Sequence, residues 1–165
     1  MLQKSHYGTQ MTQIKQMGTD YLFKEETEGI IRAFYDVYNS LGFGFLERVY
    51  QNALYFELCH RGYTCVVQQR INVYYRGNLV GEYFADIIVN GHIILELKAT
   101  ESLNDEHELQ LLNYLKATEI EVGLLLNFGK QPQVKRKICT NNNKENLCSS
   151  VQSVSSACHN EANNK

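Results

Sequence analysis

The first part of the chain with many large apolar residues carries them at helical spacing. Residues 25–39 hold one apolar stripe, made of Ile30, Ile31, Phe34, Val37 and Tyr38. Residues 45–60 hold a second, made of Leu46, Val49, Ala53 and Phe56. Glycine, which readily ends a helix, follows these segments at Gly42 and Gly62. The pattern predicts two amphipathic helices whose stripes face the core.

Strand patterns occupy the middle of the chain. Segments rich in β-branched and aromatic residues cover residues 63–69, 71–75, 79–89 and 92–99. Turn signals lie at Arg76-Gly77-Asn78 and at Asn90-Gly91. A helical pattern follows over residues 104–117, then an apolar strand over 121–128 and a basic element over 134–138 after Pro132. Two helices, a four-strand meander, a helix and a final strand predict an α/β or α+β domain with helices on the sheet faces.

The predicted hairpin over residues 83–98 combines apolar residues with three charged ones. Its first strand is apolar at both parities, which is typical of a strand covered on both faces, and Tyr83, Ala85, Ile87 and Val89 are expected to share one of them. Asp86, Glu96 and Lys98 interrupt this pattern, and the strand period of two places Glu96 and Lys98 on the same face.

The length of the loop decides where Asp86 lies. A three-residue loop, Asn90-Gly91-His92, sets Asp86 directly opposite Glu96, whereas a two-residue loop sends Glu96 to the other face. The three charged side chains can interact only if they share one face of the hairpin. We therefore predict the three-residue loop, with Gly91 at positive φ.

Two carboxylates about 5 Å apart in a covered sheet need a compensating charge. One interpretation is an ion pair with Lys98 at strand ends that reach solvent. The other is a divalent cation, because Mg²⁺ takes oxygen ligands and accepts one or two carboxylates together with waters and a substrate phosphate. Isolated buried charges cost on the order of several kcal/mol each, so we favour the metal site, with Lys98 placed to hold or deprotonate a metal-bound water.

The composition of the 165 residues limits the class of protein. Hydrophobic residues make up 44% and charged residues 21%, which is ordinary globular usage. No apolar run approaches the about 20 residues of a membrane span, and residues 1–17 lack a signal peptide's apolar stretch, so we expect an intracellular protein with no membrane contact. The net charge of -2 indicates that any nucleic-acid contact is a local patch or is assisted by metal.

Composition also divides the chain into three zones. Residues 1–20 are polar and weakly patterned, which predicts a flexible arm. Residues 21–138 are dense in large apolar side chains, which predicts one folded domain. Residues 139–165 are rich in Asn and Ser, which predicts a disordered tail, because such a segment buries too little surface to offset its ordering entropy.

The spacing of Asp86 and Glu96-Leu97-Lys98 resembles the PD-(D/E)XK nuclease superfamily, in which an Asp is followed by a Glu-x-Lys on the paired strand. Residues 44–50, Gly-Phe-Leu-Glu-Arg-Val-Tyr, resemble the signature of the GxxExxY family, a branch of that superfamily. Further matching segments are Leu41-Gly42, Gln51-Asn52-Ala53-Leu54, Glu57-Leu58, Gln68, Gly81, and residues 110–115 and 123–129. The likeness covers about residues 25–138, with Ala85 where a Pro often precedes the Asp.

The resemblance implies a restriction-endonuclease-like core, with a mixed central sheet of about four to five strands flanked by helices on both faces. It also implies that Asp86, Glu96 and the backbone carbonyl of Leu97 bind Mg²⁺ or Mn²⁺. Lys98 would then orient the attacking water.

The resemblance implies roles for three more residues. Glu47 resembles an accessory acidic residue of the superfamily. The alternative is that Glu47 and Tyr50, one turn apart, belong to an ordinary helix face, and we favour the site role for Glu47 and the helix face for Tyr50. Gln110 and Tyr114 resemble a Gln-x-x-x-Tyr motif in which the Gln holds the active-site Lys or the substrate end. They share one helical stripe, which faces either the cleft or a solvated edge, and for Gln110 we favour the cleft.

Substrate contacts have weaker candidates. Tyr50 and Tyr114 are two of them, and the run of Lys135, Arg136 and Lys137 is a third, although a short basic run is usually a solvated face. The tyrosines of the strands, Tyr74 and Tyr75 among them, are expected to be core and sheet surface rather than platforms for stacking bases.

The sequence therefore predicts a metal-dependent nuclease that hydrolyses phosphodiester bonds in nucleic acid, which we expect to be DNA. One alternative is a non-catalytic nucleic-acid-binding or protein-interaction module on the same fold, and another is a hydrolase of a different phosphate substrate. The presence of Asp86, Glu96, Lys98 and Glu47 together favours the enzyme. The net charge argues against tight sequence-independent DNA binding by a monomer, so a homodimer or a partner is one way to complete a groove.

Overall fold

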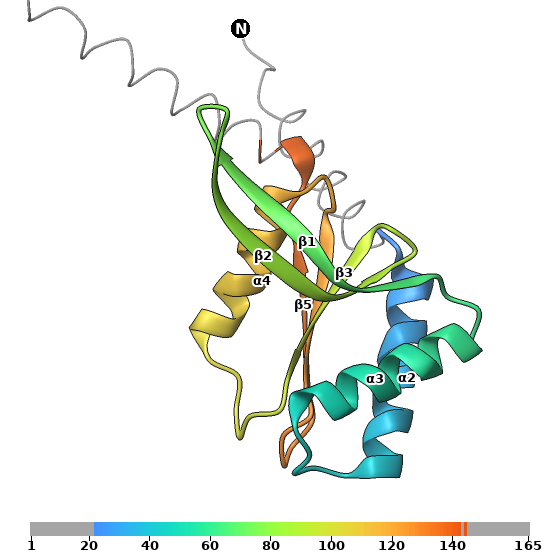
Figure 1. Ribbon diagram of the computed structural model, residues 1–165. Helices are drawn as coiled ribbons and strands as arrows, with labels where there is room; N and C mark the ends of the chain where they lie inside the picture. Colours follow the sequence, from blue (N-terminus) through green and yellow to red (C-terminus); the bar gives the residue numbers. More distant parts are fainter. Residues whose placement is uncertain (1–21, 143, 145–165) are drawn as a thin grey trace, which may run out of the picture.

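The structure, a computed structural model, describes residues 22–142 and residue 144. Five strands form one sheet in the order β1-β2-β3-β4-β5 (Figure 1). The strands are β1 (Cys65–Tyr75), β2 (Asn78–Val89), β3 (Ile93–Lys98), β4 (Val122–Asn127) and β5 (Gln133–Ile138). All neighbours are antiparallel except β3 and β4, which run parallel, so the sheet is mixed, as the resemblance implies.

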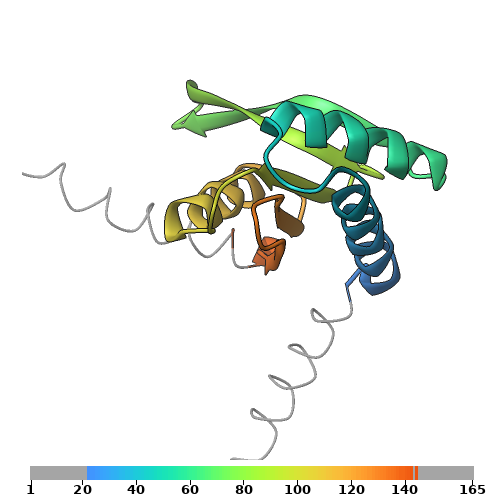
Figure 2. The ribbon, with the colours of Figure 1, turned by 90° about the horizontal axis from the view of Figure 1, so that it is seen from below.

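Helices cover both faces of this sheet (Figure 2). They are α2 (Lys24–Leu41), α3 (Glu47–His60) and α4 (Asp105–Ala117). One apolar cluster joins α2 and α3 to Ile93, Leu95 and Leu97 of β3, and a second joins α4 to Ile94 of the same strand. The even-numbered side chains of β3 therefore point toward α4. Within the part of the chain that the structure describes, no helix combines the length and apolarity of a membrane span.

The face of α3 that packs on the core is not the predicted one. Tyr50, Leu54 and Leu58 are fully buried, whereas Leu46 is 81% and Phe56 is 69% exposed. The prediction was wrong because this helix carries apolar residues on two faces, and periodicity does not indicate which of them meets the sheet.

The two short strands predicted before residue 76 are one strand, β1. Gln68 has a φ of 52° and interrupts the pairing with β2 between Val67 and Gln69, but the ladder resumes beyond it. Arg70 sits within the strand because its guanidinium pairs across the ladder with Glu82, at 3.0 Å. The basic element near the C-terminus is also a strand, β5, so the predicted final strand, β4, is the fourth of five.

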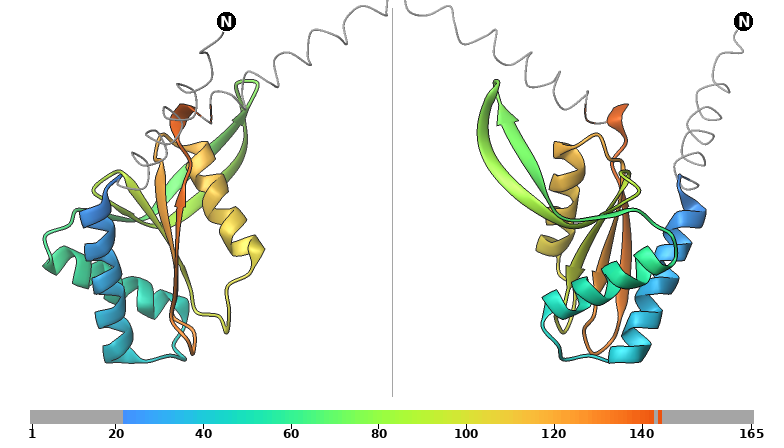
Figure 3. Two further views of the ribbon diagram at one scale, coloured as in Figure 1. Left: turned by 180° about the vertical axis from the view of Figure 1, so that it is seen from behind. Right: turned by 45° about the vertical axis from the view of Figure 1, so that its right-hand side comes forward.

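The alternation of β2 changes at Asp86. The Tyr83 ring lies 5.5 Å from that of Tyr114 on α4, and Ala85 joins the α4 cluster, but Ile87 and Val89 pack with α2 and α3. The predicted common face is therefore wrong. The change coincides with a break in the β1–β2 pairing between Val67–Ile87 and Gln69–Ala85, where Gln68 has a φ of 52°. The outer half of the β1–β2 hairpin also projects beyond the rest of the sheet, so it is not covered on both faces (Figure 3).

The predicted loop of the next hairpin is confirmed. Ile87 pairs with Leu95 and Val89 with Ile93, which leaves three residues, 90–92, in the loop. Gly91 has a φ of 76°, as predicted, and Asn90 has a φ of 50°. This register places Asp86 and Glu96 one step beyond the last pair of the ladder.

The folded part extends past the predicted boundary at Cys139. Cys139 is 8% exposed, and its N–H donates to the carbonyl of Glu121 at 2.8 Å. The Lys144 ammonium donates to the carbonyls of Thr118 and Ile120, at 2.7 and 2.9 Å. The predicted arm over residues 1–20 and most of the predicted tail lie outside the described residues.

Candidate active site

Asp86 is held beside β3 by its own side chain. The ladder between β2 and β3 ends at Ile87, and beyond it Asp86 Oδ2 accepts a hydrogen bond from the Leu97 N–H at 2.8 Å. The carboxylate thus takes the place of a backbone acceptor where the two strands stop pairing. Burial raises the pKa of Asp86, against the lowering effect of the Leu97 N–H and of Lys98.

Glu96 is a buried carboxylate with only one satisfied oxygen. It is 2% exposed, and its Oε1 accepts a hydrogen bond from the Lys98 ammonium at 2.6 Å. Its Oε2 is buried with no hydrogen-bond partner among the described residues. Burial, followed by the charge of Asp86, raises the pKa of Glu96 to about 7 despite the ion pair. Lys98 therefore compensates this carboxylate only in part.

Lys98 ends β3 and points to the same side as Glu96. Its side chain is 13% exposed, and its carbonyl accepts a hydrogen bond from the Phe128 N–H at 2.7 Å. Burial by itself lowers the pKa of Lys98, but the hydrogen bond from Lys98 to Glu96 and the negative charges of Glu96, Glu47 and Asp86 outweigh it and raise the pKa. The positive charge of the Lys98 ammonium thus faces the carboxylates of Glu96, Glu47 and Asp86.

Glu47 reaches this site from a different element. It is the first residue of α3 and is half-buried, in the turn where the helix dipole favours a negative charge. Burial raises its pKa, Lys98 lowers it and Asp86 raises it. The structure therefore brings four of the predicted site residues together from α3, β2 and β3.

Two glutamines that the sequence analysis gave no role support Asp86. The amide of Gln51, on α3, donates to the Asp86 carbonyl at 2.9 Å, and Gln51 is only 9% exposed. The amide of Gln68 donates to Asp86 Oδ1 at 3.3 Å from the irregular point of β1. In the sequence they stood out only because they lie in segments that match the family pattern. The spacing of a glutamine along the chain does not indicate whether its side chain makes a buried hydrogen bond.

Gln110 and Tyr114 lie beside each other on α4, Gln110 partly exposed and Tyr114 largely buried. Tyr114 is 3% exposed, and the Gln110 amide nitrogen lies 2.6 Å from its hydroxyl. Burial raises the pKa of Tyr114, while the Gln110 hydrogen bond lowers it and Glu96 and Lys98 also influence it. This pair therefore lies on the α4 side of the sheet, within electrostatic reach of the charged residues.

Tyr50 is part of the core. It is fully buried, its ring stacks on Phe128 at 4.4 Å, and its hydroxyl donates to the Gly42 carbonyl at 2.9 Å. The same hydroxyl lies 3.2 Å from the Phe45 N–H and accepts its hydrogen bond. Tyr50 thus shapes the loop that delivers Glu47 and offers no surface to a substrate in this arrangement.

The basic run of β5 is not gathered with the acidic residues. Strand β4 separates β5 from β3, and Lys135 and Lys137 both form ion pairs with Glu108 of α4. The Arg136 guanidinium donates to the Leu22 carbonyl at 2.6 Å. These three side chains therefore tie β5 to its neighbours within the domain.

The Glu108 ion pairs predict a dependence of stability on pH. Lys135 and Lys137 lower the pKa of Glu108 from 4.5 to about 2. A carboxyl whose pKa is lower in the folded state stabilises the fold above its unfolded pKa, and this stabilisation is lost as the pH falls toward the folded value. The urea midpoint of Glu108→Gln should therefore lie below that of the unmodified chain at pH 7, with a difference that shrinks below about pH 5. Glu119→Gln controls for net charge, and a difference that stays constant with pH would contradict the prediction.

The donor set fits a hard divalent cation. Asp86 and Glu96 supply carboxylate oxygens, and Glu96 Oε2 has no hydrogen-bond donor among the described residues. Leu97, whose N–H binds Asp86, lies between Glu96 and Lys98 and offers its backbone carbonyl as a further oxygen. No group of three or more His, Cys, Asp and Glu side chains among the described residues is arranged as a metal cage. That is compatible with Mg²⁺, which is usually bound by one or two carboxylates and keeps several waters.

One protein family matches most of the chain. A family model described as the PD-(D/E)XK nuclease superfamily matches residues 24–138. Among solved structures, the crystal structure of SSO0001 is similar, with 17% sequence identity and a TM-score of 0.44. That match covers 65% of this chain and 57% of the other, so the chain spans less than two thirds of that protein's length. No curated protein matches the chain.

Proposed function

Because the chain belongs to the PD-(D/E)XK nuclease superfamily, we propose that it is a metal-dependent nuclease that hydrolyses phosphodiester bonds in nucleic acid, with DNA as the expected substrate. The observation that carries this proposal is the buried Glu96, whose second oxygen has no partner among the described residues although Lys98 and Asp86 lie beside it. A buried, partly compensated carboxylate does little for stability, and such groups are concentrated at functional sites.

Three ligands would hold the cation, Mg²⁺ or Mn²⁺. They are the carboxylates of Asp86 and Glu96 and the backbone carbonyl of Leu97. When bound, the metal would polarise the scissile phosphate and lower the pKa of a coordinated water. Gln51 and Gln68 support this arrangement because their amides fix the carbonyl and the carboxylate of Asp86.

Lys98 and Glu47 are the groups of this chain that would handle the nucleophile. The Lys98 ammonium would orient the attacking water and place a positive charge beside the phosphate. Glu47 would accept a hydrogen bond from water at the first turn of α3, and the resemblance of residues 44–50 to the GxxExxY signature supports a place for the chain in that branch. Gln110, hydrogen-bonded to Tyr114, would hold the substrate end on the α4 side.

The ion pair between Lys98 and Glu96 favours a second candidate, a non-catalytic nucleic-acid-binding module. In that case the lysine would serve only to compensate a buried carboxylate, and no cation would be needed. The two candidates differ in whether Glu96 Oε2, which has no hydrogen-bond partner among the described residues, binds a metal ion.

Removal of divalent cations distinguishes them. We expect the full chain to cleave labelled DNA or RNA in Mg²⁺ or Mn²⁺, to lose all cleavage in EDTA, and to recover it when Mg²⁺ is restored. Single-stranded and double-stranded forms of both nucleic acids should be tested by gel electrophoresis of the products. Binding without cleavage in every metal would support the second candidate, and cleavage that persists in EDTA would contradict the first.

A further inference from the structure

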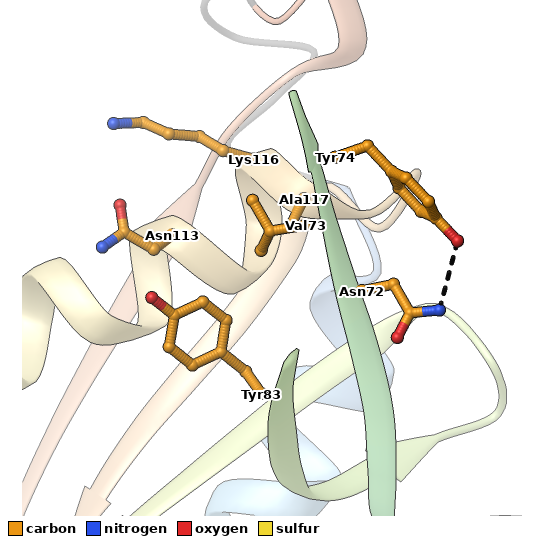
Figure 4. A pocket seen from close by; sticks show the side chains of 7 residues that line it. All are labelled: Asn72, Val73, Tyr74, Tyr83, Asn113, Lys116 and Ala117. Carbon is orange, nitrogen blue, oxygen red and sulfur yellow. Dashed lines mark hydrogen bonds between the residues drawn. The ribbon is translucent and has the colours of Figure 1, made fainter. Parts of the chain in front are cut away.

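Two adjoining pockets lie between the projecting β1–β2 hairpin and α4. The larger, of about 410 Å³, is lined by residues that include Tyr74, Tyr83, Asn113 and Lys116 (Figure 4). The other, of about 300 Å³, is lined by residues that include Tyr83, Gln110, Asn113 and Tyr114. Because Tyr83 and Asn113 line both, the pockets form one continuous depression, which we call the α4 trough. One end of the trough is the Gln110–Tyr114 pair of the candidate active site.

The wall of the α4 trough combines aromatic rings with side-chain amides. Tyr83, which is 43% exposed, and Tyr114 supply the rings. The ring of Tyr74 points to the other side of β1 (Figure 4). Asn113 and Gln110 supply amides to the trough. The Asn72 side chain points to the other side of β1, where its nitrogen lies 3.4 Å from the Tyr74 hydroxyl (Figure 4). Exposed aromatic faces beside amides are the chemistry that recognises an unpaired nucleobase.

The charges along the α4 trough differ between its two ends. Lys116 extends from α4 beside Asn113, and it forms none of the ion pairs among the described residues (Figure 4). Glu106 lines the other part of the trough, nearer Gln110. A phosphate group would therefore be favoured beside Lys116 and disfavoured beside Glu106.

We propose that the α4 trough binds an unpaired strand of nucleic acid, with a base against the ring of Tyr83, its edge toward the amide of Asn113, and a phosphate beside Lys116. This inference rests on the proposed nuclease function and defines its substrate as single-stranded. The pocket volume is within the range of small-ligand sites, whereas a base in a duplex is stacked and paired and cannot enter.

The test is a binding measurement without catalysis. Fluorescence anisotropy in EDTA would compare labelled single-stranded DNA and RNA of about 12 nucleotides with a DNA duplex of the same sequence. We expect single strands to bind at least about tenfold more tightly than the duplex. Tyr83→Ala should weaken that binding about tenfold, which corresponds to about 1.4 kcal/mol, whereas Tyr83→Phe should keep it. Tyr75→Ala is the matched control, because Tyr75 is 54% exposed on the same hairpin and does not line the trough.

The outcomes separate this inference from the proposed function. Unchanged single-strand affinity in Tyr83→Ala, an equal loss in Tyr75→Ala, duplex binding as tight as single-strand binding, or no measurable binding would overturn the α4 trough as the site. Metal-dependent cleavage by the unmodified chain together with any of these results leaves the nuclease function standing. Conversely, loss of binding in folded Tyr83→Ala with no cleavage in any metal would support the trough and overturn the nuclease. Circular dichroism of each variant establishes that it is folded.

Discussion

Glu96→Gln is expected to reduce cleavage by at least about 1,000-fold while leaving the protein at least as stable as before. The substitution keeps the size of the side chain and an acceptor for Lys98, but it removes the negative charge that a cation requires. Because Glu96 is 2% exposed and one of its oxygens has no partner among the described residues, removal of the charge also removes a desolvation cost. The midpoint of thermal unfolding should therefore stay the same or rise.

Lys98→Gln provides the informative comparison. The new amide can still donate to Glu96, whereas the positive charge beside the phosphate is lost. We expect cleavage to fall at least about 100-fold, with Mn²⁺ binding measured by calorimetry largely retained, whereas Glu96→Gln should lose both. Lys130→Gln and Glu119→Gln are matched controls at exposed positions and should keep full activity. Full cleavage by either active-site variant would contradict the assignment of that residue.

Gly129→Ala is expected to destabilise the fold by about 2–4 kcal/mol, the largest effect on stability that we predict. A Cβ at Gly129 would lie 1.9 Å from the Thr100 carbonyl oxygen, and a backbone atom cannot move aside as a flexible side chain can. The fully buried Asn127 closes the same junction, since its side chain accepts from the Thr100 N–H at 3.0 Å and donates to the Thr100 carbonyl at 2.9 Å. This clamp lies two residues beyond Lys98, so its loss should also disturb the candidate active site.

Urea unfolding followed by circular dichroism measures this effect. Gly81→Ala is the matched control, because a Cβ there would meet only Val73, at 3.9 Å, which is an ordinary contact. Alanine in place of a strand glycine should leave the free energy of unfolding unchanged or raise it by up to about 1 kcal/mol. Equal unfolding free energies for the two variants would show that the close approach at Thr100 is not a constraint on the fold.

The sequence by itself determined the three helices and the register of the central hairpin. Side chains in a strand alternate with a period of two, so the shared parity of Glu96 and Lys98, with Asp86 on the neighbouring strand, was enough to select the three-residue loop that the structure shows. The motif residues Asp86, Glu96, Lys98 and Glu47 were also identified from spacing and resemblance. These properties depend on neighbours along the chain or across one turn.

Only the tertiary structure decided which apolar surfaces are covered. The two apolar faces of α3 are indistinguishable by period, and the change of face in β2 at Asp86 occurs where the pairing with another strand is broken at Gln68. The support of Asp86 by Gln51, the pairing of Lys135 and Lys137 with Glu108, and the α4 trough between the hairpin and α4 likewise join residues that are distant in the sequence. Such contacts are decided by how elements pack together, and a local pattern of polar and apolar positions carries no information about that packing.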